Sequence, residues 1–185
     1  MDFKDEYLVG KQILEGNLKC EDISGETSKE IFSDRNQIVV DSGFLIRQFL
    51  VNDKDTKGIE YIAFGDMGMS PTGNVREVRP TDCKDFRLDN EVYKKDIEFE
   101  TFDDDYGYGV RFSVVLEKDE CNGADGSQLI TEYGLFSSTL YKNTGDSNKE
   151  NRNIMFSRKT RAGIFKDFEM RLKFTWTIYF KKTCI

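Results

Sequence analysis

The chain has 185 residues, of which 38% are hydrophobic and 33% charged, a balance typical of a soluble domain with extensive polar surface. Its formal net charge of −7 disfavours contact with a phosphate backbone over the whole surface, so we expect no direct nucleic-acid binding. There is no His in the chain, which excludes the usual Ser-His-Asp and Cys-His arrangements, and we expect no enzymatic activity.

The charge is unevenly distributed along the chain. Residues 152–185 carry nine Lys or Arg and two acids, a net charge of +7. Because the net charge of the whole chain is −7, residues 1–151 carry a net charge of −14. An acidic body and a basic end favour pairing between copies of the chain. A basic strand that pairs with acidic strands of its own sheet would explain the same distribution.

The cysteines and the first residues bear on metal sites and targeting. Cys20, Cys83, Cys121 and Cys184 are widely separated, so a zinc site would need four scattered thiolates. We therefore expect no metal and no cofactor. The acidic start Met1–Glu6 does not resemble a signal peptide, and no run approaches the roughly 20 apolar residues of a membrane span. These features predict synthesis in a reducing cytoplasm and no membrane partner.

Residues 1–36 are polar, charged and interrupted by Gly, which predicts an N-terminal arm, extended or ordered on a neighbour. An edge strand followed by a loop is the alternative. A modest apolar patch in this segment is the expected contact with the neighbour, and it consists of Tyr7, Leu8, Val9, Ile13 and Leu14. The remaining residues, 37–185, are predicted to form the folded domain.

The domain begins with a short apolar run and one amphipathic segment. Apolar side chains recur at a spacing of four within Ser42–Val51, which predicts a helix there, with Asp41 or Ser42 as a suitable cap. Ile59–Phe64 is strand-like in content. Gly65–Pro80 shows no periodic core pattern and is expected to be a long surface loop that makes contacts.

Two alternating runs surround the turn Asp103–Gly109 and predict a β-hairpin. Its three aspartates suggest a calcium loop, but no Glu follows at the required spacing. A solvated turn is therefore the interpretation that we adopt for this stretch.

One acid lies within an apolar strand. Glu132 belongs to the run Leu129–Phe136, where a charge is costly unless it is paired. Arg158 follows Phe156 in a second apolar run. We therefore predict a structural ion pair between Glu132 and Arg158 across neighbouring strands.

The final stretch shows the longest alternation in the chain, and period two over such a length predicts a β-strand. Every second position holds a large apolar side chain, and these predicted core residues are Phe168, Met170, Leu172, Phe174, Trp176, Ile178 and Phe180. Together with the hairpin signals, this strand predicts a mainly β fold, an antiparallel β-sandwich with one helix.

Six short stretches, taken in order, resemble a pattern of bacteriophage tail proteins. They are Val39–Leu50, Ile59–Gly65, Leu88–Tyr93, Ile130–Phe136, Met155–Arg158, and Ile164–Lys166 running into Phe174–Ile178. Their order and spacing are similar to the virion-attached domain of tail-fibre, tail-collar and baseplate-associated proteins, over about residues 37–182. The resemblance implies a β-rich domain without enzymatic role that anchors or caps part of the particle. This chain departs from it by its N-terminal arm and by the lack of a long fibre after the domain.

The expectation is thus a structural component of a phage virion, in the tail, baseplate or neck, that forms a ring or other homo-oligomer and contacts other tail proteins. The alternative is a carbohydrate-binding β-sandwich, because exposed aromatics on such folds bind glycans. Tyr106, Tyr108 and Trp176 would be its platform, although Trp176 lies on the apolar row that predicts the core.

Overall fold

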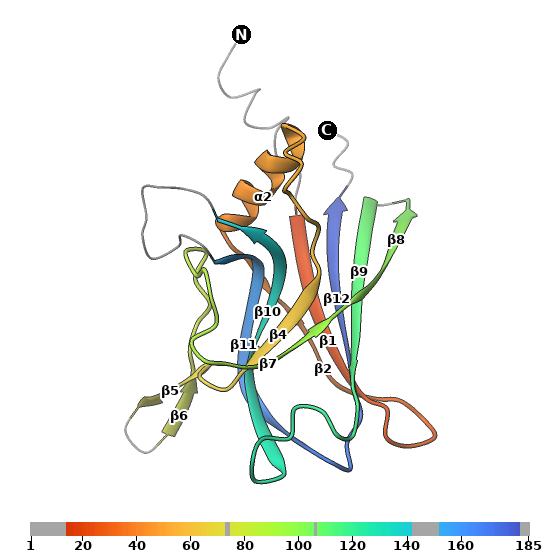
Figure 1. The fold of residues 1–185 in the computed structure, drawn as a ribbon. Coiled ribbons are helices and arrows are strands. Elements are labelled where there is room, and N and C mark those ends of the chain that lie inside the picture. Colours follow the sequence, from red (N-terminus) through yellow and green to blue (C-terminus); the bar gives the residue numbers. More distant parts are fainter. Residues whose placement is uncertain (1–13, 73–74, 106, 142–151, 182–185) are drawn as a thin grey trace.

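The computed structural model describes residues 14–72, 75–105, 107–141 and 152–181. Two antiparallel five-stranded sheets pack face to face, and one helix lies at one end of them (Figure 1). The predicted fold class, a mainly β sandwich with one helix, is confirmed.

The first sheet has the strand order β2-β1-β12-β9-β8. Its strands are β1 Leu14–Asp22, β2 Lys29–Arg35, β8 Glu98–Asp104, β9 Gly107–Leu116 and β12 Leu172–Lys181. The predicted hairpin is the β8–β9 pair, and the Asp104 carboxylate accepts a hydrogen bond from the Gly107 backbone N–H at 2.9 Å in its turn.

The second sheet has the strand order β3-β11-β10-β4-β7. Its strands are β3 Gln37–Ile38, β4 Tyr61–Gly65, β7 Glu91–Asp96, β10 Ser127–Leu140 and β11 Asn153–Asp167. The loop predicted for Gly65–Pro80 is wrong in part, because a hairpin of β5 (Met69–Thr72) and β6 (Val75–Val78) forms there. Helix α2 spans Asp41–Leu50, within one residue of the predicted helix at each end.

Strand β12 is the centre of its sheet, with β1 on one side and β9 on the other. Its alternation holds from Leu172 to Ile178, where every second side chain is buried, and Phe180 is partly buried. The Trp176 side chain is fully buried between the sheets. Met170 precedes the strand and packs partly against the core.

The prediction that Phe168 belongs to the core is wrong, because its side chain is 63% exposed. The chain turns at this point: the Asp167 carboxylate accepts backbone hydrogen bonds from Glu169 at 2.9 Å and Met170 at 3.2 Å. The apolar alternation in the sequence thus runs through a turn that separates β11 from β12, and the strand starts only at Leu172.

The prediction of an arm over residues 1–36 is wrong from Leu14 onward. Strand β1 pairs with β12 from Leu14↔Phe180 to Asp22↔Leu172, and β2 pairs with β1. Leu18 and Cys20 are fully buried. The apolar row of β1 contains a Gly and a Cys among charged residues, so its periodicity is weak in the sequence although a strand neighbour completes its packing. Tyr7, Leu8, Val9 and Ile13 lie outside the described residues.

At two corners the chain passes from an edge strand of one sheet to an edge strand of the other. It leaves β2 through Asn36 into β3, and it leaves β7 through Ile97 into β8. Backbone hydrogen bonds fix both corners, from Asn36 N–H to the Gly16 carbonyl at 3.1 Å and from Ile97 N–H to the Glu60 carbonyl at 3.0 Å. Each crossing joins the edges of the two sheets around a shared core.

The second sheet is buried on both faces. One face packs on the first sheet, where the Phe174 ring of β12 lies 5.0 Å from that of Phe64 and 5.6 Å from that of Tyr133. The other face carries a second apolar cluster in which Leu88 covers Phe136 and Met155. Burial on both faces explains why β10 has an almost continuous run of buried residues instead of an alternation.

Candidate functional site

The segment that carries Arg79, Asp85, Leu88 and Asp89 covers the second sheet. It is held by a group of charged residues, which we call the ionic cluster: Arg79, Asp85, Asp89, Glu132 and Arg158. The Arg158 guanidinium lies 2.7 Å from Glu132, 2.6 Å from Asp89 and 2.9 Å from Asp85, measured between nitrogen and carboxylate oxygen. Arg79 also pairs with Asp89. The structure therefore brings the predicted pair Glu132 and Arg158 together and adds three groups to it.

Glu132 also fixes the backbone of two loops. Its carboxylate accepts hydrogen bonds from the backbone N–H groups of Met67 at 3.3 Å, Asp89 at 3.0 Å and Asn90 at 2.9 Å. The approach is so close that a Cβ on Gly65 would lie 2.5 Å from a Glu132 carboxylate oxygen, so only Gly fits at that position.

Burial and pairing act against each other in the ionic cluster. Burial alone would lower the pKa of the Arg158 guanidinium, but its bond to Asp89 and the charges of Asp85 and Glu132 raise the pKa above its ordinary value. Burial alone would likewise raise the pKa of Asp89, and the bonds from Arg158 and Arg79 hold it below the usual range. Arg158 and Asp89 are thus kept in their charged forms, which suits a clamp rather than a general acid.

A second clamp lies beside the helix. Arg152 pairs with Asp41 in the first turn of α2 and donates a hydrogen bond to the Phe86 carbonyl at 2.5 Å. The guanidinium also lies 4.5 Å from the centre of the Phe86 ring. The prediction that Asp41 or Ser42 caps the helix is wrong, because Val40 occupies the N-cap position without a side-chain hydrogen bond, and Asp41 binds Arg152 instead.

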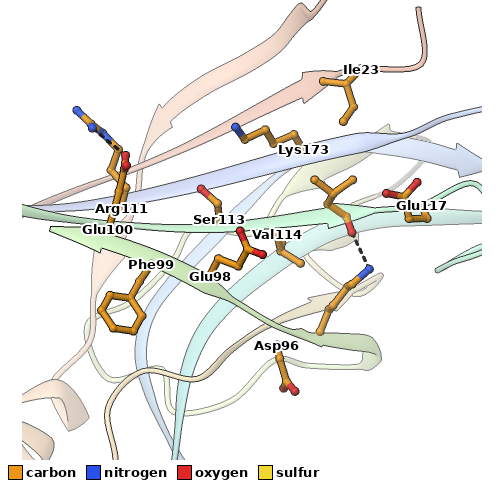
Figure 2. A pocket seen from close by; sticks show the side chains of 12 residues that line it. Ile23, Asp96, Glu98, Phe99, Glu100, Arg111, Ser113, Val114, Glu117 and Lys173 are labelled. Carbon is orange, nitrogen blue, oxygen red and sulfur yellow. Dashed lines mark hydrogen bonds and ion pairs between the residues drawn. The ribbon is translucent and has the colours of Figure 1, made fainter.

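A shallow groove of about 720 Å³ lies where β7 bends into β8 (Figure 2). It is lined by charges of both signs, and the labelled ones are Asp96, Glu98, Glu100, Arg111, Glu117 and Lys173. Arg111 pairs with Glu100 at 3.0 Å, and Glu117 pairs with Arg171 at 2.6 Å. Three of these six charges, Glu100, Arg111 and Glu117, are therefore compensated by an ion-pair partner.

The alternative of a glycan platform loses its central residue. Trp176 is buried, Tyr108 is exposed on β9, and Tyr106 lies outside the described residues. Because Trp176 faces the core, it cannot share a surface with Tyr108. Phe99 is the aromatic side chain among the residues that line the groove in Figure 2.

The most exposed apolar surface lies on α2. Ile46, Phe49 and Leu50 are 41%, 49% and 82% exposed, and they follow one another at the i, i+3, i+4 spacing of a single helix face. Val51 follows the helix directly and is also exposed. We call these four residues the α2 face. Leu45, one turn before Phe49, is buried.

Sequence reasoning missed the α2 face, although a signal was present. The helix contains only two charged residues, Asp41 and Arg47, and its apolar residues exceed what one buried stripe requires. A helix that is apolar nearly all round is normally covered on more than one side. Asp85, Asp89 and Arg79 were missed for a different reason: they lie in a loop, where no period marks a residue as buried.

Within the described residues, no group of three or more Cys, Asp or Glu is placed to hold a metal ion. No helix among these residues is both long and apolar enough to cross a membrane. No protein-family model, curated protein or solved structure matches the chain.

Proposed function

We propose that this protein is a non-enzymatic structural component of a bacteriophage virion, placed in the tail, baseplate or neck. Its copies form a ring or other oligomer and contact other tail proteins after synthesis in the host cytoplasm. The observation that carries this proposal is the α2 face, an apolar helix surface exposed at one end of the sandwich. Contiguous exposed apolar residues of this kind mark contacts between proteins.

The chemistry of the described residues supports a scaffold rather than a catalyst. Two of the fully buried charged side chains, Glu132 and Arg158, bind each other, and Glu132 also binds a loop backbone. A scaffold benefits from such a clamp because it holds the covering segment, and with it the approach to α2, in one arrangement.

The resemblance to the phage domains is compatible with this architecture. Four of its six stretches correspond to α2, β4, β10 and β12, and Met155–Arg158 lies in β11. Leu88–Tyr93 covers the second sheet and enters β7. The stretches thus contain Glu132, Arg158 and Gly65, which are in contact around one buried site.

The proposal is tested by incorporation into particles. A tagged chain would be produced during infection by the phage that encodes it, and purified particles would be probed for the tag. We expect the unaltered chain and the exposed control Asp125→Asn to be recovered in particles. Leu50→Asp should be depleted, because it places a charge in an apolar contact. Absence of the unaltered chain from particles would contradict the proposal, and a parallel glycan titration would test the carbohydrate-binding alternative.

A further inference from the structure

The α2 face needs an occupant, and the chain contains a segment with suitable chemistry. Tyr7, Leu8 and Val9 are contiguous apolar residues, and Ile13 follows directly before β1. The neighbouring positions are charged or polar, so this segment cannot build a core of its own. We propose that residues Tyr7–Ile13 of one copy cover the α2 face of a neighbouring copy.

The point at which the described chain begins supports this pairing. Strand β1 starts at Leu14, and in Figure 1 that end of β1 lies at the same end of the sandwich as α2. Val9 is five residues before Leu14 and can reach about 17 Å from it when the chain is extended. Helix α2 has ten residues and is about 15 Å long. Segments of these lengths match, and β1 begins at the end of the sandwich at which α2 lies.

The charges of the two partners are complementary. Arg47 is the basic residue of the last turn of α2; it is exposed, and its guanidinium lies 4.8 Å from the centre of the Phe44 ring, at the border of the α2 face. Asp5 and Glu6 directly precede Tyr7. Docking of Tyr7–Val9 on the α2 face would bring these carboxylates towards Arg47 and give the contact a direction.

The surface area that a stable interface must bury favours an exchange of N-terminal segments between two copies. A stable interface buries about 1,200–2,000 Å² in total, more than one face of a ten-residue helix supplies. Reciprocal exchange of two segments would cover two α2 faces in one contact. This step rests on the proposed function, because a segment that covered the α2 face of its own subunit would not join subunits.

The test is a cross-link between two full-length chains, each with one introduced cysteine. Both carry Cys83→Ser and Cys184→Ser, while the buried Cys20 and Cys121 are kept. One chain carries Leu8→Cys and the other Phe49→Cys, and the mixture is oxidised mildly. The control pairs Leu8→Cys with Asp125→Cys. Asp125 is exposed and precedes the start of β10, whereas α2 contacts Tyr141, which follows the other end of that strand.

We expect about tenfold more disulfide-linked heterodimer from the Leu8 and Phe49 pair than from the control pair, because docking raises the local concentration of the two thiols. Equal yields would overturn the proposal. A chain that carries both substitutions and cross-links only within itself would overturn it as well. Loss of Leu50→Asp from particles without a Leu8 to Phe49 cross-link would leave the proposed function standing and reject this occupant.

Discussion

Arg158 and Glu132 form an ion pair of 2.7 Å in which the two side chains are 1% and 0% exposed. They stand on neighbouring strands, β11 and β10, of a sheet that is covered on both faces. The pair lies beneath the loop that carries Asp85 and Asp89, so it connects the sheet to its cover. Removal of Arg158 would leave the Glu132 carboxylate without solvent or a counterion, whereas removal of Glu132 would leave Arg158 paired with Asp85 and Asp89.

Arg158→Met is expected to lower the free energy of unfolding by about 3–5 kcal/mol, because it leaves the buried Glu132 carboxylate unpaired. Urea denaturation measures this loss. The matched control is Lys57→Ala, which removes an exposed pair with Glu60 at 4.0 Å and should cost at most about 1 kcal/mol. Equal losses in the two variants would show that the ionic cluster does not hold the cover.

Acid should weaken the same clamp. The pKa of Asp89 is held below its ordinary value of 3.8 in the folded chain, so its bonds contribute stability above that pH. This contribution is lost as the pH falls through the lowered pKa of the folded state. Asp89→Asn should therefore show a smaller drop in unfolding free energy between pH 6 and about pH 3 than the unaltered chain. An unchanged drop would assign the acid sensitivity to other carboxylates.

Trp176→Ala should destabilise the chain by about 3–5 kcal/mol, as expected for a large aromatic side chain that is fully buried. Thermal unfolding followed by circular dichroism reports the effect. Tyr108→Ala is the surface control, since more than half of its side chain is exposed. A melting temperature that hardly moves in Trp176→Ala would contradict the packing described for β12.

Truncation separates the segment before β1 from the sandwich. Removal of residues 1–13 should leave a folded domain, whereas removal of residues 1–36 deletes β1 and β2 and exposes one side of β12. We expect only the shorter truncation to unfold cooperatively in urea. If both truncated chains fold alike, β1 is not an integral strand of the first sheet.

Much of the fold was predictable because its signals are local. The alternation from Leu172 to Ile178 and the turn between β8 and β9 can each be recognised from a few consecutive residues. Strand β1 was not recognised because its side chains become a core only when β12 lies beside them. The prediction for Phe168 was wrong for the opposite reason. The local alternation of apolar residues continues through a turn that Asp167 fixes by hydrogen bonds, so it predicts a strand where there is none.

The residues of the candidate site likewise fall into those that local signals predict and those that they do not. Glu132 could be singled out because a charge interrupts an apolar run, and the cost of burying it required a partner such as Arg158. The other members of the ionic cluster lie far away in the sequence, and no spacing rule links them to β10. The α2 face was hidden because its residues also fit a helix that packs on the domain, and only their exposure reveals a second apolar side.

A cryo-EM map of the intact particle tests the central claim most directly. We expect density for the sandwich in the tail, baseplate or neck, with the α2 face of each copy buried against a neighbouring protein. A particle without this chain, or one in which Ile46, Phe49 and Leu50 face solvent in every copy, would contradict it.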